Sequence, residues 1–152
     1  MSKNYLSRVI SMLCVCTMCS CAAYSGPDGY GDIPWGTDIK SFKDDGFIFL
    51  GEHQGFAYYN CIGSERSFDN YKPKKVECGF IDGKLKSIYT ELAGRSNCYG
   101  VKKELIDRYG NPSGGFLDKI LRWEVPGTTV LYVERNSGMS CSARISHAAT
   151  TH

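Results

Sequence analysis

The chain has 152 residues and a formal net charge of +2, from 18 lysines and arginines against 16 aspartates and glutamates. Lys3 and Arg8 are the only charged residues among the first 20, so the remainder of the chain is neutral. A neutral domain lacks the basic surface that nucleic-acid binding requires, which excludes that class of function. With 42% hydrophobic and 22% charged residues, the composition is that of a globular domain and argues against long disorder.

The first 20 residues have the pattern of a secretory signal peptide. A short polar start with two positive charges precedes the apolar run Val9–Cys19. As a helix this run would cover about 16 Å, against roughly 30 Å for the hydrocarbon core of a bilayer. We therefore expect residues 1–20 to direct export and not to span a membrane.

The end of this leader, Met18-Cys19-Ser20-Cys21, resembles the lipobox of bacterial lipoproteins. In that family an apolar residue and two small residues precede a cysteine that is lipidated and becomes the new N-terminus. The resemblance assigns this role to Cys21, with Cys19 as the second choice because it would place the bulky Met18 at the cut. It implies a palmitate-bearing membrane anchor, in which each buried methylene contributes about 0.8 kcal/mol.

A plain secretory signal cut near Ala22 or Ala23 is the alternative to lipidation. If Cys21 is lipidated, the same resemblance favours the outer membrane, because Ala22 and not an aspartate follows the cysteine. The domain would then lie in the periplasm or at the cell surface. Residues 21–34 contain several glycines and prolines without apolar periodicity, so we expect them to form a flexible tether.

From residue 35 to 146 the pattern is that of one α+β domain. Runs rich in aromatic and β-branched residues predict strands at 47–52, 55–61, 74–81, 85–92, 117–125, 129–134 and 139–145. Turn signals such as Asp82-Gly83 join neighbouring runs as hairpins. The order predicts an antiparallel sheet of about six to seven strands with two helices packed on one face. We expect the tail, residues 147–152, to fray.

Two segments predict the helices. Thr37 is expected to cap a short helix that ends at Gly46. Asn97 is expected to cap a longer helix that ends at Tyr109, where a Gly-Asn-Pro sequence stops it. One side of the longer helix is apolar and is expected to face the sheet; it carries Cys98, Val101, Leu105 and Tyr109.

A second, more diffuse resemblance extends over the domain. The opening Pro34-Trp35-Gly36-Thr37, together with a later Tyr109-Gly110-Asn-Pro112 and with Trp123, is similar to small exported bacterial domains. Those families are mostly of unknown function. No functional residue is carried over from them.

Four cysteines lie in the domain, an even number that in an exported protein predicts two disulfides. Cys98 lies on the apolar side of the second helix, and Cys141 alternates with other apolar residues towards one face of the last strand. Both are therefore expected to point into the core and to pair. Cys61 and Cys78 lie on strands close in sequence and are expected to form the second bridge.

Enzymatic motifs are sparse. Of the three histidines, His53 is expected in a solvated hairpin turn, and His147 and His152 in the frayed tail. The sequence contains no nucleophile elbow, zinc-binding helix motif or phosphate loop. We therefore expect no catalytic residue, no metal site and no other cofactor.

The longest stretch between strands, residues 62–75, is the expected partner surface. It contains Arg66, Phe68 and Tyr71, which are residue types enriched at binding hot spots, and a disulfide at its base would reduce the entropy lost on binding. A solvated loop without a binding role is the alternative.

The expected function is therefore that of a membrane-anchored cell-envelope lipoprotein whose disulfide-stapled domain binds a protein partner. Envelope assembly and protection against a toxin or hydrolase both suit this design. Two alternatives stay open: an envelope enzyme acting on peptidoglycan or lipid, and a small-ligand-binding periplasmic domain. The enzyme would require acid and base residues that converge in a concave site.

Overall fold

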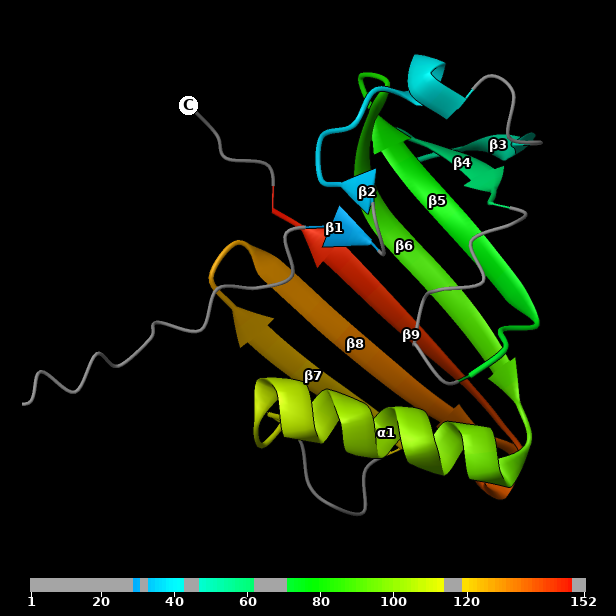
Figure 1. Ribbon diagram of the computed structural model, residues 1–152, viewed down its shortest axis with the longest axis vertical. Helices are drawn as coiled ribbons and strands as arrows, with labels where there is room; N and C mark the ends of the chain where they lie inside the picture. Colours follow the sequence, from blue (N-terminus) through cyan, green and yellow to red (C-terminus); the bar gives the residue numbers. More distant parts are fainter. Residues whose placement is uncertain (1–28, 31–32, 43–46, 62–70, 114–118, 149–152) are drawn as a thin grey trace, which may run out of the picture.

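The computed structural model describes residues 29–30, 33–42, 47–61, 71–113 and 119–148. In these ranges the chain forms a seven-stranded antiparallel sheet with strand order β3-β4-β5-β6-β9-β8-β7 and one α-helix (Figure 1). The fold class is α+β, as the sequence predicts. The number of strands is also within the predicted range.

The main sheet consists of two meanders that meet at its centre, where β6 pairs with β9. Its strands are β3 (Ile48–His53), β4 (Phe56–Asn60), β5 (Lys75–Ile81), β6 (Lys84–Ala93), β7 (Ile120–Val125), β8 (Thr128–Arg135) and β9 (Ser140–His147). The helix α1 (Arg95–Tyr109) connects the two meanders. The remaining elements are the paired strands β1 (Gly29–Tyr30) and β2 (Ile33–Pro34) and the 3-10 helices η1 (Ile39–Phe42) and η2 (Asn136–Gly138).

Two-residue turns close two of the three hairpins of the first meander, β3-β4 and β5-β6. Asp82 and Gly83 join β5 to β6 with φ values of 51° and 73°, and Gln54 and Gly55 join β3 to β4 with φ values of 50° and 80°. Left-handed backbone at both positions matches the twist of the flanking strands, and glycine adopts it without steric cost. The turn predicted at Asp82-Gly83 is confirmed.

One face of the sheet carries the core. A cross-strand row of buried residues runs over five strands and consists of Cys78, Ile88, Ile145, Val130 and Trp123. Because successive side chains alternate between faces, this row and its neighbours two residues away define the covered face. Figure 1 shows α1 crossing one end of this face, with η1, β1 and β2 towards the other end.

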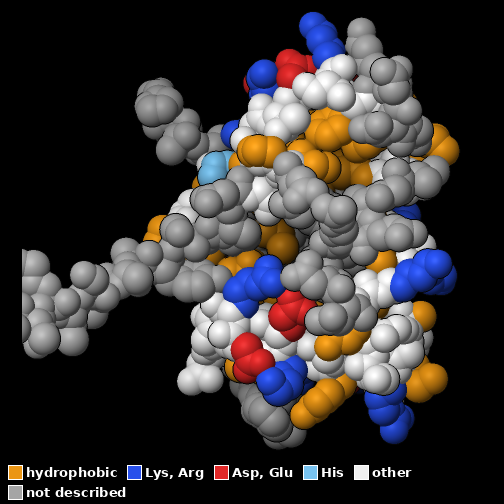
Figure 2. All heavy atoms as spheres, viewed as in Figure 1, with side chains coloured by type: hydrophobic (Ala, Val, Ile, Leu, Met, Phe, Trp, Pro, Cys, Tyr) orange, Lys and Arg blue, Asp and Glu red, His pale blue; other side chains and the backbone are white. Residues whose placement is uncertain are grey.

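The core therefore divides into two clusters on the same face. The first cluster, called the cluster under α1, lies between this helix and the sheet. Its buried residues include Leu92, Val101, Leu105, Leu121 and Tyr132. Under η1 the buried residues include Phe42, Val76, Phe80, Leu85 and Ile88, and Figure 2 shows hydrophobic side chains gathered over this end. The side chain of Trp35 packs against both clusters and connects them.

The prediction of a first α-helix is wrong, because this segment forms only the four-residue 3-10 helix Ile39–Phe42. The Thr37 hydroxyl donates to a backbone carbonyl three residues earlier, at 2.7 Å. The Asp38 carboxylate accepts from a backbone N–H two residues later, at 2.9 Å. The Asp38 bond is an N-cap to the second residue of η1, so Asp38 caps this short helix and the predicted cap Thr37 does not. The predicted end at Gly46 lies outside the described residues.

The second helix begins earlier than predicted. Arg95 is its first residue, and Gly94, with φ of 94°, lets the chain turn directly from β6 into the helix. Asn97 does not cap the helix; its side-chain amide donates to the carbonyl four residues earlier, at 2.8 Å. The predicted end at Tyr109 is confirmed, and Gly110 follows in a left-handed conformation.

Both ends of the folded domain extend beyond the expected range of 35–146. β1 and β2 lie inside the expected tether 21–34, and Ile33 packs against the core. β9 continues through His147, which is part of the sheet and not of a frayed tail. The imidazole of His147 stacks on Trp35 with ring centroids 5.8 Å apart. This contact joins the two ends of the domain, which local composition could not reveal.

Candidate functional site

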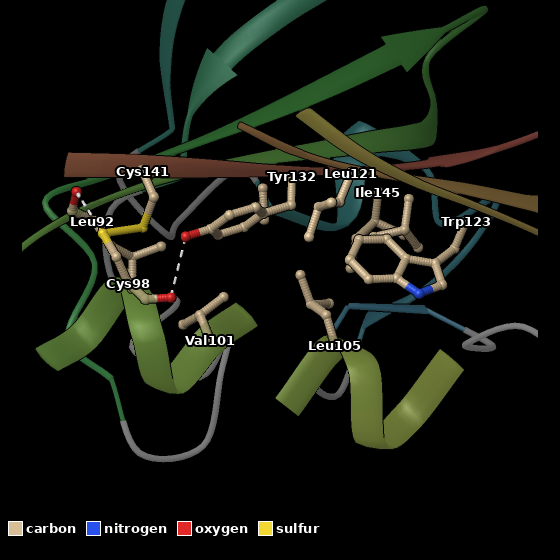
Figure 3. Close-up of a cluster of buried hydrophobic side chains, with 11 residues drawn as sticks. Leu92, Cys98, Val101, Leu105, Leu121, Trp123, Tyr132, Cys141 and Ile145 are labelled. Atoms are coloured by element: carbon tan, nitrogen blue, oxygen red, sulfur yellow. Dashed lines mark hydrogen bonds between the residues drawn. A yellow bond between two sulfur atoms is a disulfide. The ribbon is translucent and has the colours of Figure 1, made fainter. Parts of the chain in front are cut away.

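The helix α1 is fixed to the sheet by a disulfide and a buried hydrogen bond (Figure 3). Cys98 on α1 and Cys141 on β9 form the disulfide that the sequence predicts, with Cα atoms 5.6 Å apart and both side chains buried. The Tyr132 hydroxyl donates to the Cys98 backbone oxygen at 3.1 Å. Burial raises the pKa of this hydroxyl, which keeps it protonated as a donor. Figure 3 shows Val101 and Leu105 pointing from the helix towards the sheet beside these contacts.

Replacing Tyr132 by Phe should lower the free energy of unfolding by about 1 kcal/mol, because one buried hydrogen bond is lost while the ring stays in place. Urea unfolding would measure this change. The matched control is Tyr99→Phe, which removes the same atom from a side chain that is 70% exposed. The control should unfold like the wild type; equal losses in the two variants would contradict a stabilising role of the buried hydroxyl.

A groove of about 300 Å³ lies beside this junction, between α1 and the turn from β8 to β9. Its volume is at the lower end of the range for small-ligand sites. The exposed ring of Tyr99 places the groove at the surface. The lining residues are Arg95, Cys98, Tyr99, Lys102, Lys103 and Ile106 from α1, with Glu134, Ser137 and Gly138 from the turn region.

Three cationic side chains line the groove, and two of them have carboxylate partners. Lys102 Nζ lies 3.9 Å from Glu134, and Lys103 Nζ lies 2.5 Å from Asp107. The hydrogen bond to Asp107 raises the pKa of Lys103. Arg95 makes no ion pair with any residue that the structure describes. Its guanidinium is therefore the group best able to bind an added anion, such as a carboxylate or a phosphate.

A left-handed turn forms the other wall of the groove. Asn136, Ser137 and Gly138 have φ values of 49°, 52° and 84°, which is an uncommon conformation for the two residues other than glycine. A Cβ at Gly138 would lie 3.3 Å from a carboxylate oxygen of Glu134 and 3.9 Å from the stem of Arg95. Glycine at this position thus lets the turn approach both charged side chains closely.

The second predicted disulfide is also present. Cys61 and Cys78 are joined with Cα atoms 6.0 Å apart, and both are buried in the cluster under η1. This bridge ties the end of β4 to β5 across a sequence separation of 17 residues. The two disulfides therefore stabilise opposite ends of the covered face.

The expected partner surface is described only at its end. Arg66 and Phe68 lie outside the described residues, as does Cys21. The half-buried ring of Tyr71 packs against the cluster under α1. A Cβ at Gly100 would overlap this ring, so glycine in the middle of the helix permits the contact. Tyr71 thus contributes to packing, whatever role it has in binding.

The other chemically reactive residues are dispersed. His53 is exposed, as the sequence predicts, but it is the last residue of β3 and does not lie in the turn; His152 lies outside the described residues. Among the residues with described positions, no group of three histidine, cysteine or acidic side chains is arranged to hold a metal. The described part of the chain also includes no helix with the length and hydropathy needed to cross a membrane.

Sequence reasoning missed the groove beside α1. Arg95, Tyr99 and Lys102 follow each other at helical spacing, so a common exposed side could have been inferred from the sequence. Placing the helix start at Asn97 left Arg95 outside the helix and hid this pattern. The contribution of Glu134 gave no local signal, because it comes from the end of β8, which is distant in the sequence.

No protein-family model, curated protein or solved structure matches this chain. The features that bear on function are therefore its own: the leader, the two disulfides and the groove. Each of them can be tested separately.

Proposed function

We propose that this protein is exported, anchored by lipid at Cys21, and binds a protein partner in the cell envelope through its disulfide-stabilised domain. The observation that carries the proposal is the pair of disulfides, Cys61–Cys78 and Cys98–Cys141. Structural disulfides form and persist in oxidising compartments and are rare in the cytosol. An extracytoplasmic location also fits the basic and apolar leader.

A lipid on Cys21 would keep the domain close to the membrane. Only residues 22–28 separate the anchor from β1, which is a shorter tether than the sequence suggests. At about 3.5 Å per residue, seven extended residues reach about 25 Å. The domain would therefore work within about one domain diameter of the membrane surface. The outer membrane is the proposed location, with Ala22 following the lipidated cysteine.

The groove beside α1 supports a binding role. A partner with an acidic side chain could pair with Arg95, while an apolar neighbour of that acid packs on Tyr99 and Ile106. The disulfide at Cys98 holds this part of the helix in place, so little conformational entropy would be lost on binding. Arg95, which has no ion pair among the described residues, also supports the second candidate function, binding of a small anionic ligand.

Metabolic labelling with palmitate tests the anchor directly. The wild-type chain should incorporate the label and enter the detergent phase, and Cys21→Ala should lose all of the label. Cys19→Ala is the matched control, since it changes the neighbouring candidate cysteine and should retain full labelling. Export itself is checked by the protection of all four domain cysteines from a thiol reagent before reduction.

Two outcomes would contradict this proposal at different points. Full labelling of Cys21→Ala together with unlabelled Cys19→Ala would move the anchor to Cys19. An unlabelled wild-type chain with both disulfides formed would support the plain secretory signal cut near Ala22, and would leave an exported domain without an anchor.

A further inference from the structure

The edge strand β3 exposes an unusual run of large hydrophobic side chains. Ile48, Phe49 and Leu50 are 53%, 53% and 48% exposed, although they are consecutive residues of a strand. β3 is the outermost strand of the sheet and pairs only with β4 among the described strands. Its outer side therefore presents backbone N–H and C=O groups together with apolar side chains, which is a template for another strand.

The opposite edge of the sheet is protected. Ser113 forms an antiparallel bridge with Arg122 of β7, with a hydrogen bond of 2.7 Å from the Ser113 N–H to the Arg122 carbonyl. The Arg122 and Glu124 side chains form an ion pair on the same strand. Charged residues and covering segments are the usual means of preventing edge-to-edge association. β3 has no lysine or arginine, and its only acid, Glu52, lies near its end.

The aromatic core continues to the β3 edge. The ring of Phe80 contacts Tyr59 with centroids 5.5 Å apart, and Tyr59 contacts Phe49 at 5.2 Å. This series of rings starts in the buried cluster under η1 and ends on an exposed side chain. A core that stops abruptly at an exposed edge resembles one half of a homodimer interface.

We propose that β3 pairs with β3 of a second copy of this chain, antiparallel and related by a two-fold axis. In the register that places Phe49 opposite its counterpart, Ile48 lies opposite Leu50 of the second copy, and every such pair is apolar. No like charges face each other in this register, so the strand is self-complementary. The pairing of β3 with β4 is irregular between Phe49 and Gly51, and Leu50 has no partner residue in β4. The two sheets then form one continuous sheet, and this inference does not depend on the lipid anchor.

Molar mass from light scattering tests the proposal on the full processed chain, with bound detergent subtracted. The wild type should have twice the mass of one chain. Leu50→Lys should raise the dimer dissociation constant by about 100-fold, tenfold for each of the two Leu50–Ile48 pairs that the lysines disrupt. Ile120→Lys is the matched control, since Ile120 is 56% exposed on the protected edge, and it should dimerise like the wild type. Circular dichroism and thermal unfolding check that both variants fold.

Crosslinking in intact cells gives a second measurement. A cysteine introduced by Phe49→Cys, which lies opposite its counterpart in this register, should form a dimer that is stable on a non-reducing gel, whereas Ile120→Cys should remain monomeric. A wild-type chain that is monomeric at every concentration tested would overturn the proposal. So would equal crosslinking from positions 49 and 120, or a partner of different mass captured at position 49 in place of a second copy.

Discussion

Replacing both Cys98 and Cys141 by Ala should lower the free energy of unfolding by about 4 kcal/mol. The disulfide closes a loop of 43 residues, and chain-entropy arithmetic gives this magnitude for a loop of that length. Domains of this size are stable by only about 5–15 kcal/mol, so the variant should be marginally folded. Urea unfolding of the oxidised proteins, followed by tryptophan fluorescence, would measure the change.

The matched control is the double replacement of Cys61 and Cys78 by Ala. Its loop separates residues by 17 positions, so the expected loss is about 3 kcal/mol. Both variants remove two buried sulfur atoms, and the difference between them isolates the effect of loop length. If the Cys98/Cys141 variant unfolded at the same urea concentration as the wild type, this would contradict a bridge between α1 and β9.

The sequence predicts the strands and the disulfides well because their signals are local. Alternation within β9 puts Cys141 on the same face as Ala143, and helical spacing puts Cys98 beside Val101. The structure buries all four of these residues in the cluster between α1 and the sheet. The alternation of the strand and the spacing of the helix were therefore enough to choose one of the three possible disulfide connectivities.

The predictions are wrong where contacts between residues distant in sequence decide whether a segment joins the fold. β1 and β2 fold because Ile33 and Trp35 pack on clusters formed by much later strands. Residue His147 stays in the sheet because β8 pairs with it and Trp35 stacks on its ring. Composition alone assigned both segments to flexible ends, since glycine-rich and small-residue sequences carry no apolar period.

The candidate site was still harder to predict than the fold. The groove needs a helix side and a left-handed turn that are about 40 residues apart in the chain and are brought together by the sheet and the Cys98–Cys141 bridge. The exposed edge at β3 depends on strand order, which a single sequence does not specify. Both features are properties of the topology, and only the charge and apolar character of their residues are visible beforehand.

The helix α1 should be the element on which the stability of this half of the domain depends most. Leu105 is fully buried between α1 and the sheet, among Leu121, Trp123 and Tyr132 in the same cluster. Leu105→Ala should lower the free energy of unfolding by about 3–4 kcal/mol, because it removes buried methyl groups and leaves a cavity that rigid strands cannot fill. Urea unfolding at constant pH would measure the loss.

Ile120→Ala is the matched control, since leucine and isoleucine have the same number of carbon atoms and Ile120 is 56% exposed on β7. Its expected loss is below about 1 kcal/mol, because little apolar surface is returned to water. If α1 packs against the sheet as described, Leu105→Ala must lose clearly more free energy of unfolding than Ile120→Ala. Equal losses would mean that the helix contributes no more to the core than an exposed strand edge, and that the Cys98–Cys141 disulfide alone keeps it in place.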